Sequence, residues 1–179
     1  MMTRSIWTFA LFLLVLPTHT FAAEYTVRDP HVRSLELELL DDLQQGAQAS
    51  PTLKSLLDRL ETSDLVVYLM FDHALPAHSA GRISLMAAVP GRRYLRITID
   101  RRNIGCQRLA ILGHELQHAV EIADAAEATD QEGVASLYRR IGFRSDNGLK
   151  SSFDSRLAIE TGQRVRREAL AATATIGSR

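Results

Sequence analysis

The spacing of apolar residues predicts two helices near the start of the chain. Four leucines between residues 32 and 45 recur at intervals of three and four, which places them on one face of a helix that ends at Gly46. Ser50 followed by Pro51 is typical of a helix start, with a capping serine and a proline at the first helical position. The leucine spacing continues this second helix to about residue 61.

The pattern then changes to one typical of strands. Residues 65–71 are continuously apolar, which indicates a strand covered on both faces. Residues 83–89 form a second candidate, and residues 94–100 alternate apolar and polar side chains, as in a strand with one wet face. Pro90 and Gly91 between the last two strands favour a turn, so we expect a hairpin.

Three helices are expected in the remainder of the chain. The first covers about residues 104–126. Thr129 and Glu132 are spaced as a capping box that opens the second, and Ser151 with Asp154 opens the third in the same way. Two helices, three strands and three helices in this order predict an α+β fold.

The first 23 residues differ from the rest. Arg4, an apolar run over residues 6–16 and the small residues Ala22 and Ala23 are typical of a secretory signal peptide. The run is shorter than the ~20 residues that span a bilayer. We therefore expect signal cleavage, a single domain over residues 24–179 and a periplasmic or secreted protein that contacts no membrane. An uncleaved N-terminal anchor is the alternative.

Composition narrows the function further. The chain has 21 basic and 21 acidic residues, so it lacks the net positive charge typical of a nucleic-acid binder. Its one cysteine, Cys106, excludes an internal disulfide and a zinc finger built from cysteines. Five arginines gather near the hairpin, and we interpret them as a solvated face. They are Arg92, Arg93, Arg96, Arg101 and Arg102.

Candidate catalytic chemistry lies in the helix predicted over residues 104–126. His114 and His118 are four residues apart, so both imidazoles project from one helical face about one turn apart. That spacing suits two adjacent corners of a tetrahedral Zn²⁺ site with bonds of roughly 2.0–2.1 Å. Glu115 lies about 100° further around the helix, where its carboxylate can act as a general base on a water molecule held by the ion.

Residues 111–120, Ile-Leu-Gly-His-Glu-Leu-Gln-His-Ala-Val, resemble the extended zinc-binding motif of the zincin metallopeptidases. This resemblance implies a zincin-like fold, in which a small antiparallel or mixed sheet packs with an active-site helix and flanking helices. More narrowly, residues 114–121, 137–142 and 153–155 resemble a group of small exported bacterial proteins. The narrower likeness implies no particular substrate.

A zinc site of this kind needs a third protein ligand and an open fourth position. No histidine follows His118, and Glu121 and Asp124 stand where metzincins have glycine and histidine. The resemblance therefore narrows to the gluzincins, in which a carboxylate on a later helix completes the site. In the similar exported proteins we expect an acidic residue, more often glutamate, at the position of Asp154, which makes Asp154 the expected ligand.

Other residues remain candidates for the third ligand, because aspartate is one methylene shorter than the glutamate more often expected at this position. Glu160 and Glu132 are the alternatives on the later helices. Glu121 shares the histidine face but lies about 10.5 Å along the helix axis from His114, so it is better placed to orient a histidine. His73 and His78 follow the apolar strand, and we interpret them as surface residues of a loop.

The expected function is that of an exported, zinc-dependent hydrolase acting on a peptide or protein. Glu115 would take a proton from water and pass it to the leaving amine. The exposed edge of the hairpin would hold an extended peptide by strand addition. Tyr138 and the loop arginines are candidates for oxyanion stabilisation. The alternative is a non-enzymatic exported domain, stabilised by zinc or binding a partner.

Overall fold

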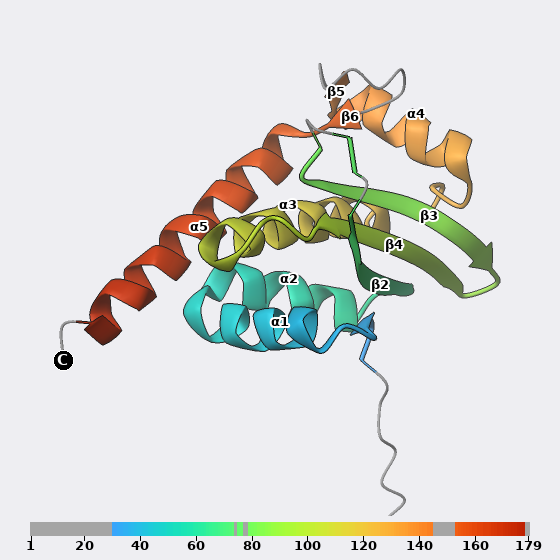
Figure 1. Ribbon diagram of the computed structural model, residues 1–179. Helices are drawn as coiled ribbons and strands as arrows, with labels where there is room; N and C mark the ends of the chain where they lie inside the picture. The colour runs from blue at the N-terminus through green and yellow to red at the C-terminus, as the bar shows by residue number, and fades with distance from the viewer. Residues whose placement is uncertain (1–29, 74, 77–78, 145–152, 178–179) are drawn as a thin grey trace, which may run out of the picture.

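The protein has a mixed α+β fold, as the order of predicted elements indicated (Figure 1). The structure, a computed structural model, describes residues 30–73, 75–76, 79–144 and 153–177. The predicted signal segment, His78 and Ser151 lie outside these residues. Within them, five helices and six strands follow in the order β1 (Val32–Ser34), α1 (Leu37–Ala49), α2 (Pro51–Glu61), β2 (Leu65–Asp72), β3 (Gly81–Val89), β4 (Arg92–Asp100), α3 (Gly105–Ala123), α4 (Gln131–Ile141), β5 (Phe143–Arg144), β6 (Phe153–Asp154) and α5 (Arg156–Gly177).

The main sheet has the strand order β1-β2-β4-β3. Strands β1, β2 and β4 are parallel, whereas β3 pairs antiparallel with β4 and forms one edge. The predicted hairpin at Pro90 and Gly91 is confirmed, because it joins β3 to β4. Strands β5 and β6 pair separately, next to α4. In the described part of the chain, no helix is both long enough and apolar enough to span a membrane.

One face of the main sheet packs on helices, and α3 contacts strands β2, β3 and β4. The alternation predicted for residues 94–100 is confirmed, since Leu95, Ile97 and Ile99 are fully buried. The prediction that residues 65–71 are covered on both faces is wrong. Val66 is buried, but Tyr68 and Met70, which point to the same face, are 40% and 37% exposed.

The first predicted helix is displaced. Residues 32–34 form β1, because Val32 pairs with Val67 of β2 rather than continuing the leucine stripe. Leu35 is fully exposed, and the helix passes through Gly46 instead of ending there. A side chain at Gly46 would collide with a leucine of α2 and one of α3, so this glycine allows close packing of the helices. The start of α2 at Ser50 and Pro51 is confirmed.

Two predicted helix caps are also wrong. Asp130, not Thr129, caps α4, and its carboxylate accepts the Gly133 N–H. The last helix begins at Arg156, where the Ser155 hydroxyl accepts the Ala158 N–H. Asp154 therefore lies in β6, before the helix, and the helix does not begin at the predicted Ser151–Asp154 box.

Helices α3 and α5 cross at two glycines. A Cβ on Gly113 of α3 would lie 2.7 Å from a methyl group of Val165. A Cβ on Gly162 of α5 would lie 2.8 Å from the main-chain oxygen of Ala110. The two backbones therefore approach more closely than any larger residue would allow, and the start of α5 is held against α3.

Buried guanidinium groups hold both ends of α3. Arg93 of β4, whose side chain is 5% exposed, makes two hydrogen bonds of 2.7 and 2.8 Å with Asp64. It also donates to four main-chain oxygens in and after the last turn of α3, those of Ile122, Ala123, Ala125 and Ala128. At the other end, Arg108 bonds to Glu38 and Asp42 of α1. The oxygens of Ile122 and Ala125 also accept main-chain N–H groups, so Arg93 adds a second donor to these two and supplies a donor to those of Ala123 and Ala128.

We predict that Arg93→Met lowers the free energy of unfolding by about 1–3 kcal/mol, because the Ala123 and Ala128 carbonyls and the half-buried Asp64 carboxylate lose the guanidinium donor. Arg82→Met, at an exposed position of the same sheet, is the control and should change it by less than about 0.5 kcal/mol. Urea denaturation measures both. Equal small effects would show that the Arg93 contacts contribute little.

The Asp64–Arg93 pair also predicts a pH dependence. The Arg93 hydrogen bond, opposed in part by burial, holds the pKa of Asp64 below its ordinary value. The pair therefore stabilises the protein above the unfolded pKa, near 3.8, and this contribution is lost as pH falls through the lower folded value. Urea midpoints of wild type and Asp64→Asn should differ at neutral pH and converge in acid. A gap that stays constant would contradict this assignment.

Candidate metal centre

Two of the predicted ligands lie one turn apart on α3, as their spacing required. The His114 and His118 rings meet edge to face with centroids 4.8 Å apart. His118 is buried and His114 is half-buried, so the pair is open to solvent on the His114 side. This face of α3 is the one crossed by the start of α5.

Asp154 joins the two histidines from a distant part of the sequence. Its Oδ1 atom lies 3.5 Å from His114 Nε2 and 3.4 Å from His118 Nε2. Strand β6 ends there, directly before α5, so the α3–α5 crossing sets the position of this carboxylate. The structure therefore brings together the three residues that the sequence pattern and the zincin resemblance grouped as metal ligands.

One ligand atom from each of the three residues lies within 4.8 Å of the other two, and two of the three distances match those of a zinc site. Ligands at the corners of a tetrahedron with bonds of about 2.0–2.1 Å lie roughly 3.3 Å from one another. The two Nε2–Oδ1 distances are close to that value and are long for direct hydrogen bonds. Two imidazoles and one carboxylate are also a donor set that zinc takes in catalytic sites. The residues present therefore fit the ion.

Glu121 lies behind the group rather than in it. Its Oε2 atom accepts a hydrogen bond from His118 Nδ1 at 2.8 Å, on the opposite side of the ring from Nε2. A carboxylate in this position fixes the tautomer and the orientation of a ligating histidine. The other two alternatives lie apart, since Glu132 pairs with Arg139 at the surface and Glu160 is exposed on α5.

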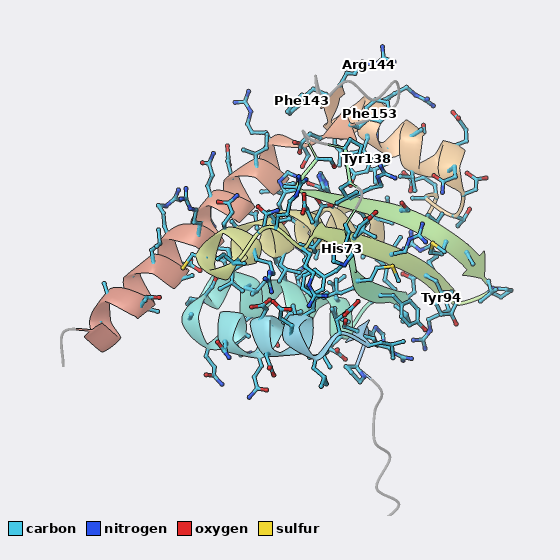
Figure 2. All side chains as sticks on the ribbon, in the orientation of Figure 1. His73, Tyr94, Tyr138, Phe143, Arg144 and Phe153 are labelled. Atoms are coloured by element: carbon cyan, nitrogen blue, oxygen red, sulfur yellow. The ribbon has the colours of Figure 1, made fainter. Side chains whose placement is uncertain are left out.

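Tyr138 of α4 contacts the buried ring of His118. This position differs from the oxyanion-stabilising role for which the sequence made Tyr138 a candidate. Its hydroxyl lies 3.0 Å from His118 Nδ1 and donates to Glu121 Oε2 at 3.2 Å. Burial and the Glu121 charge raise the pKa of the phenol, so it stays protonated. Because Tyr138 contacts the ring nitrogen remote from the ligand group, it is not placed to stabilise an oxyanion. Figure 2 shows it where α4 approaches β6.

Glu115 is almost completely buried beside the three grouped residues. Removal from water raises the pKa of its carboxyl to about 7, with a smaller contribution of the same sign from Asp154. Its Oε1 atom lies against Gly81 at the start of β3, where an added Cβ would come within 2.6 Å. Glu115 is therefore held at the edge of the sheet, and the charge of His118 partly opposes the effect of burial on its pKa.

The two histidines differ in proton affinity. Burial lowers the pKa of His114, and the neighbouring His118 lowers it further. Burial also acts to lower the pKa of His118, but the nearby carboxylates of Asp154 and Glu121 outweigh this and raise the value to about 9. The carboxylates around His118 thus favour a positive charge at this place, which a cation can supply instead of a proton.

A cleft of about 310 Å³ opens beside the grouped residues. His114, Glu115 and Asp154 line one part of it, and the other described residues that line it carry no charged side chain. Those walls come from the segment before β3, from α3 and from α5. They include Ser79, Gly81, Gln107, Ile111, Ile159 and Gln163.

The remaining candidates do not join the site. His73 is exposed and outside the ligand group, and Cys106 is partly buried in the first turn of α3. The five-arginine face is not simply solvated. Arg93 is buried, while Arg101 and Arg102 pair with Glu38 and Asp100.

Comparisons of the chain with protein-family models, with curated proteins and with solved structures found no match. The function is therefore inferred from the geometry of the site.

We predict that the protein binds one Zn²⁺ per chain and that Asp154→Asn weakens this binding at least about tenfold, because it removes a charged ligand. Glu160→Gln removes an exposed carboxylate from α5, six residues after Asp154, and should leave the zinc affinity unchanged. Competition with a chromogenic chelator measures both. An unaffected Asp154→Asn, or a loss in Glu160→Gln alone, would place the third ligand elsewhere.

Proposed function

We propose that the protein is an exported, zinc-dependent hydrolase of peptides with a zincin-like active site. The observation that carries the proposal is the meeting of His114, His118 and Asp154 at ligand spacing, with Glu115 lining the same cleft. A zinc site that only stabilises a fold needs no buried acid beside it, and burying an unpaired carboxyl is unfavourable. The presence of Glu115 there favours catalysis.

The chemistry divides between the ion and the chain. A bound zinc ion would polarise the carbonyl to be cleaved and lower the pKa of water towards ~7. Glu115 would accept the proton of the attacking water and deliver it to the leaving amine. Its position supports this role, because Glu115 lines the same cleft as His114 and Asp154.

The edge of β3 supports a peptide as substrate. The Ala80 carbonyl accepts the Asp100 N–H on the β4 side, so the alternate residues Gly81 and Ile83 direct their backbone groups to the open edge. Gly81 lies against Glu115, and an extended peptide paired there would pass the catalytic group. The Gly81 carbonyl already accepts the Ser79 hydroxyl, and the Leu85 carbonyl accepts the Gln131 side chain. Pairing with a peptide would therefore fall on Ile83 and on the Gly81 N–H, a short length of edge.

Two further parts of the proposal, the kind of peptide bound and export, are supported by the cleft and by the N-terminal sequence pattern. Walls without charged side chains suit peptide segments with uncharged side chains. The signal-like pattern of residues 1–23 supports export.

We predict that Glu115→Gln lowers peptide hydrolysis by about 10²–10⁴-fold, because the amide keeps the shape of the side chain but cannot accept the proton. Zinc content, measured by elemental analysis, should stay that of wild type, since both histidines and Asp154 remain. Hydrolysis of a peptide library by the zinc-loaded proteins provides the rate. A zinc-loaded wild type that cleaves nothing, or a variant as active as wild type, would favour the non-enzymatic alternative.

A further inference from the structure

We propose that Ser155 and Glu121 form a brace that positions two of the three metal ligands at once. The proposal rests on the zinc site of the proposed function. It assigns positioning roles to residues that do not themselves contact the ion.

The two oxygens of one carboxylate hold two separate parts of the chain. Glu121 Oε2 accepts the hydrogen bond of His118 Nδ1, and Glu121 Oε1 accepts the Ser155 hydroxyl at 2.6 Å. Both Glu121 and Ser155 are buried, with 8% and 3% of their surfaces exposed. Water therefore competes little for these hydrogen bonds, and the carboxylate links α3 to the start of α5.

Ser155 passes this constraint on to Asp154, which directly precedes it. The Ser155 N–H donates to Asp154 Oδ1 at 2.7 Å, the same oxygen that faces both histidines. The Ser155 hydroxyl also accepts the Ala158 N–H at 3.0 Å, which caps α5. The hydroxyl thus donates to Glu121 and accepts from an N–H of the helix, and these two hydrogen bonds together fix its position.

A second serine in the chain makes the same two bonds far from the site. The Ser50 hydroxyl accepts the Leu53 N–H at 3.0 Å, which caps α2, and donates to Glu168 of α5 at 2.5 Å. Ser50 is fully buried. Ser50→Ala therefore removes a helix cap and a serine–carboxylate bond, as Ser155→Ala does, without touching the ligands, although this bond is part-buried and Glu168 keeps its bonds from Thr52. It is a matched control for the structural part of the effect.

The experiment measures zinc affinity and the visible absorption spectrum of the Co²⁺-loaded protein for wild type, Ser155→Ala and Ser50→Ala. We expect Ser155→Ala to raise the zinc dissociation constant about 10–100-fold, the range for outer-shell partners of a metal ligand. Its Co²⁺ absorption bands should also shift or change in intensity, because the ligands are no longer held in one arrangement. Ser50→Ala should lower the thermal midpoint of unfolding by a similar amount but keep the wild-type affinity and spectrum.

Glu121→Gln provides a second variant in case Ser155→Ala does not fold. His118 and Ser155 bond to different oxygens of Glu121, and in the amide one of these atoms becomes an NH₂ donor, so one of the two bonds is lost. We again expect weaker zinc binding and an altered spectrum. If wild type binds zinc while both variants keep its affinity and spectrum, the brace is refuted and the zinc site stands. Equal losses in Ser155→Ala and Ser50→Ala would also refute it, since they would reflect general destabilisation. If wild type binds neither ion, the proposed function itself fails.

Discussion

Helices α3 and α5 cross with their backbones in close contact, and the candidate metal centre depends on this crossing. Gly113 and Gly162 lack the side chains that would separate the helices, since a Cβ at either position would collide with the facing helix. The start of α5 is thereby held over the histidine face of α3, and Asp154 in β6 comes within 3.5 Å of both imidazoles. A larger residue at either glycine would move a ligand as well as a helix.

Helix α3 lies at the centre of the core and yet buries several ionisable side chains. Glu115, His118 and Glu121 are each less than a tenth exposed, and burial of such groups is costly unless they are paired. Arg93 and Arg108 hold the two ends of the helix, and the network of Tyr138, Ser155 and Glu121 holds its middle. A cation at the ligand group would offset the negative charge that Glu121 and Asp154 bring together, so metal binding and folding stability should be coupled.

Local signals in the sequence predicted those parts of the structure that depend on neighbouring residues. Ser50 and Pro51 identified the start of α2, and the four-residue histidine spacing identified one face of α3. The prediction failed where distant partners decide. Val32 forms a strand because Val67 lies beside it, and Arg93 is buried because Asp64 and the end of α3 surround it. Asp154 was grouped with the histidines through a family resemblance, whereas the capping role of Ser155 and its bond to Glu121 become visible only when α5 is packed on α3.

The central claim is that His114, His118 and Asp154 hold one zinc ion. A crystal structure of the zinc-loaded protein, with anomalous diffraction recorded at the zinc edge, tests it most directly. We expect one strong peak bonded to both Nε2 atoms and to Asp154 Oδ1 at about 2.0–2.2 Å, with Glu121 still on His118 Nδ1. No peak at this position, or an ion bound without Asp154, would contradict the claim.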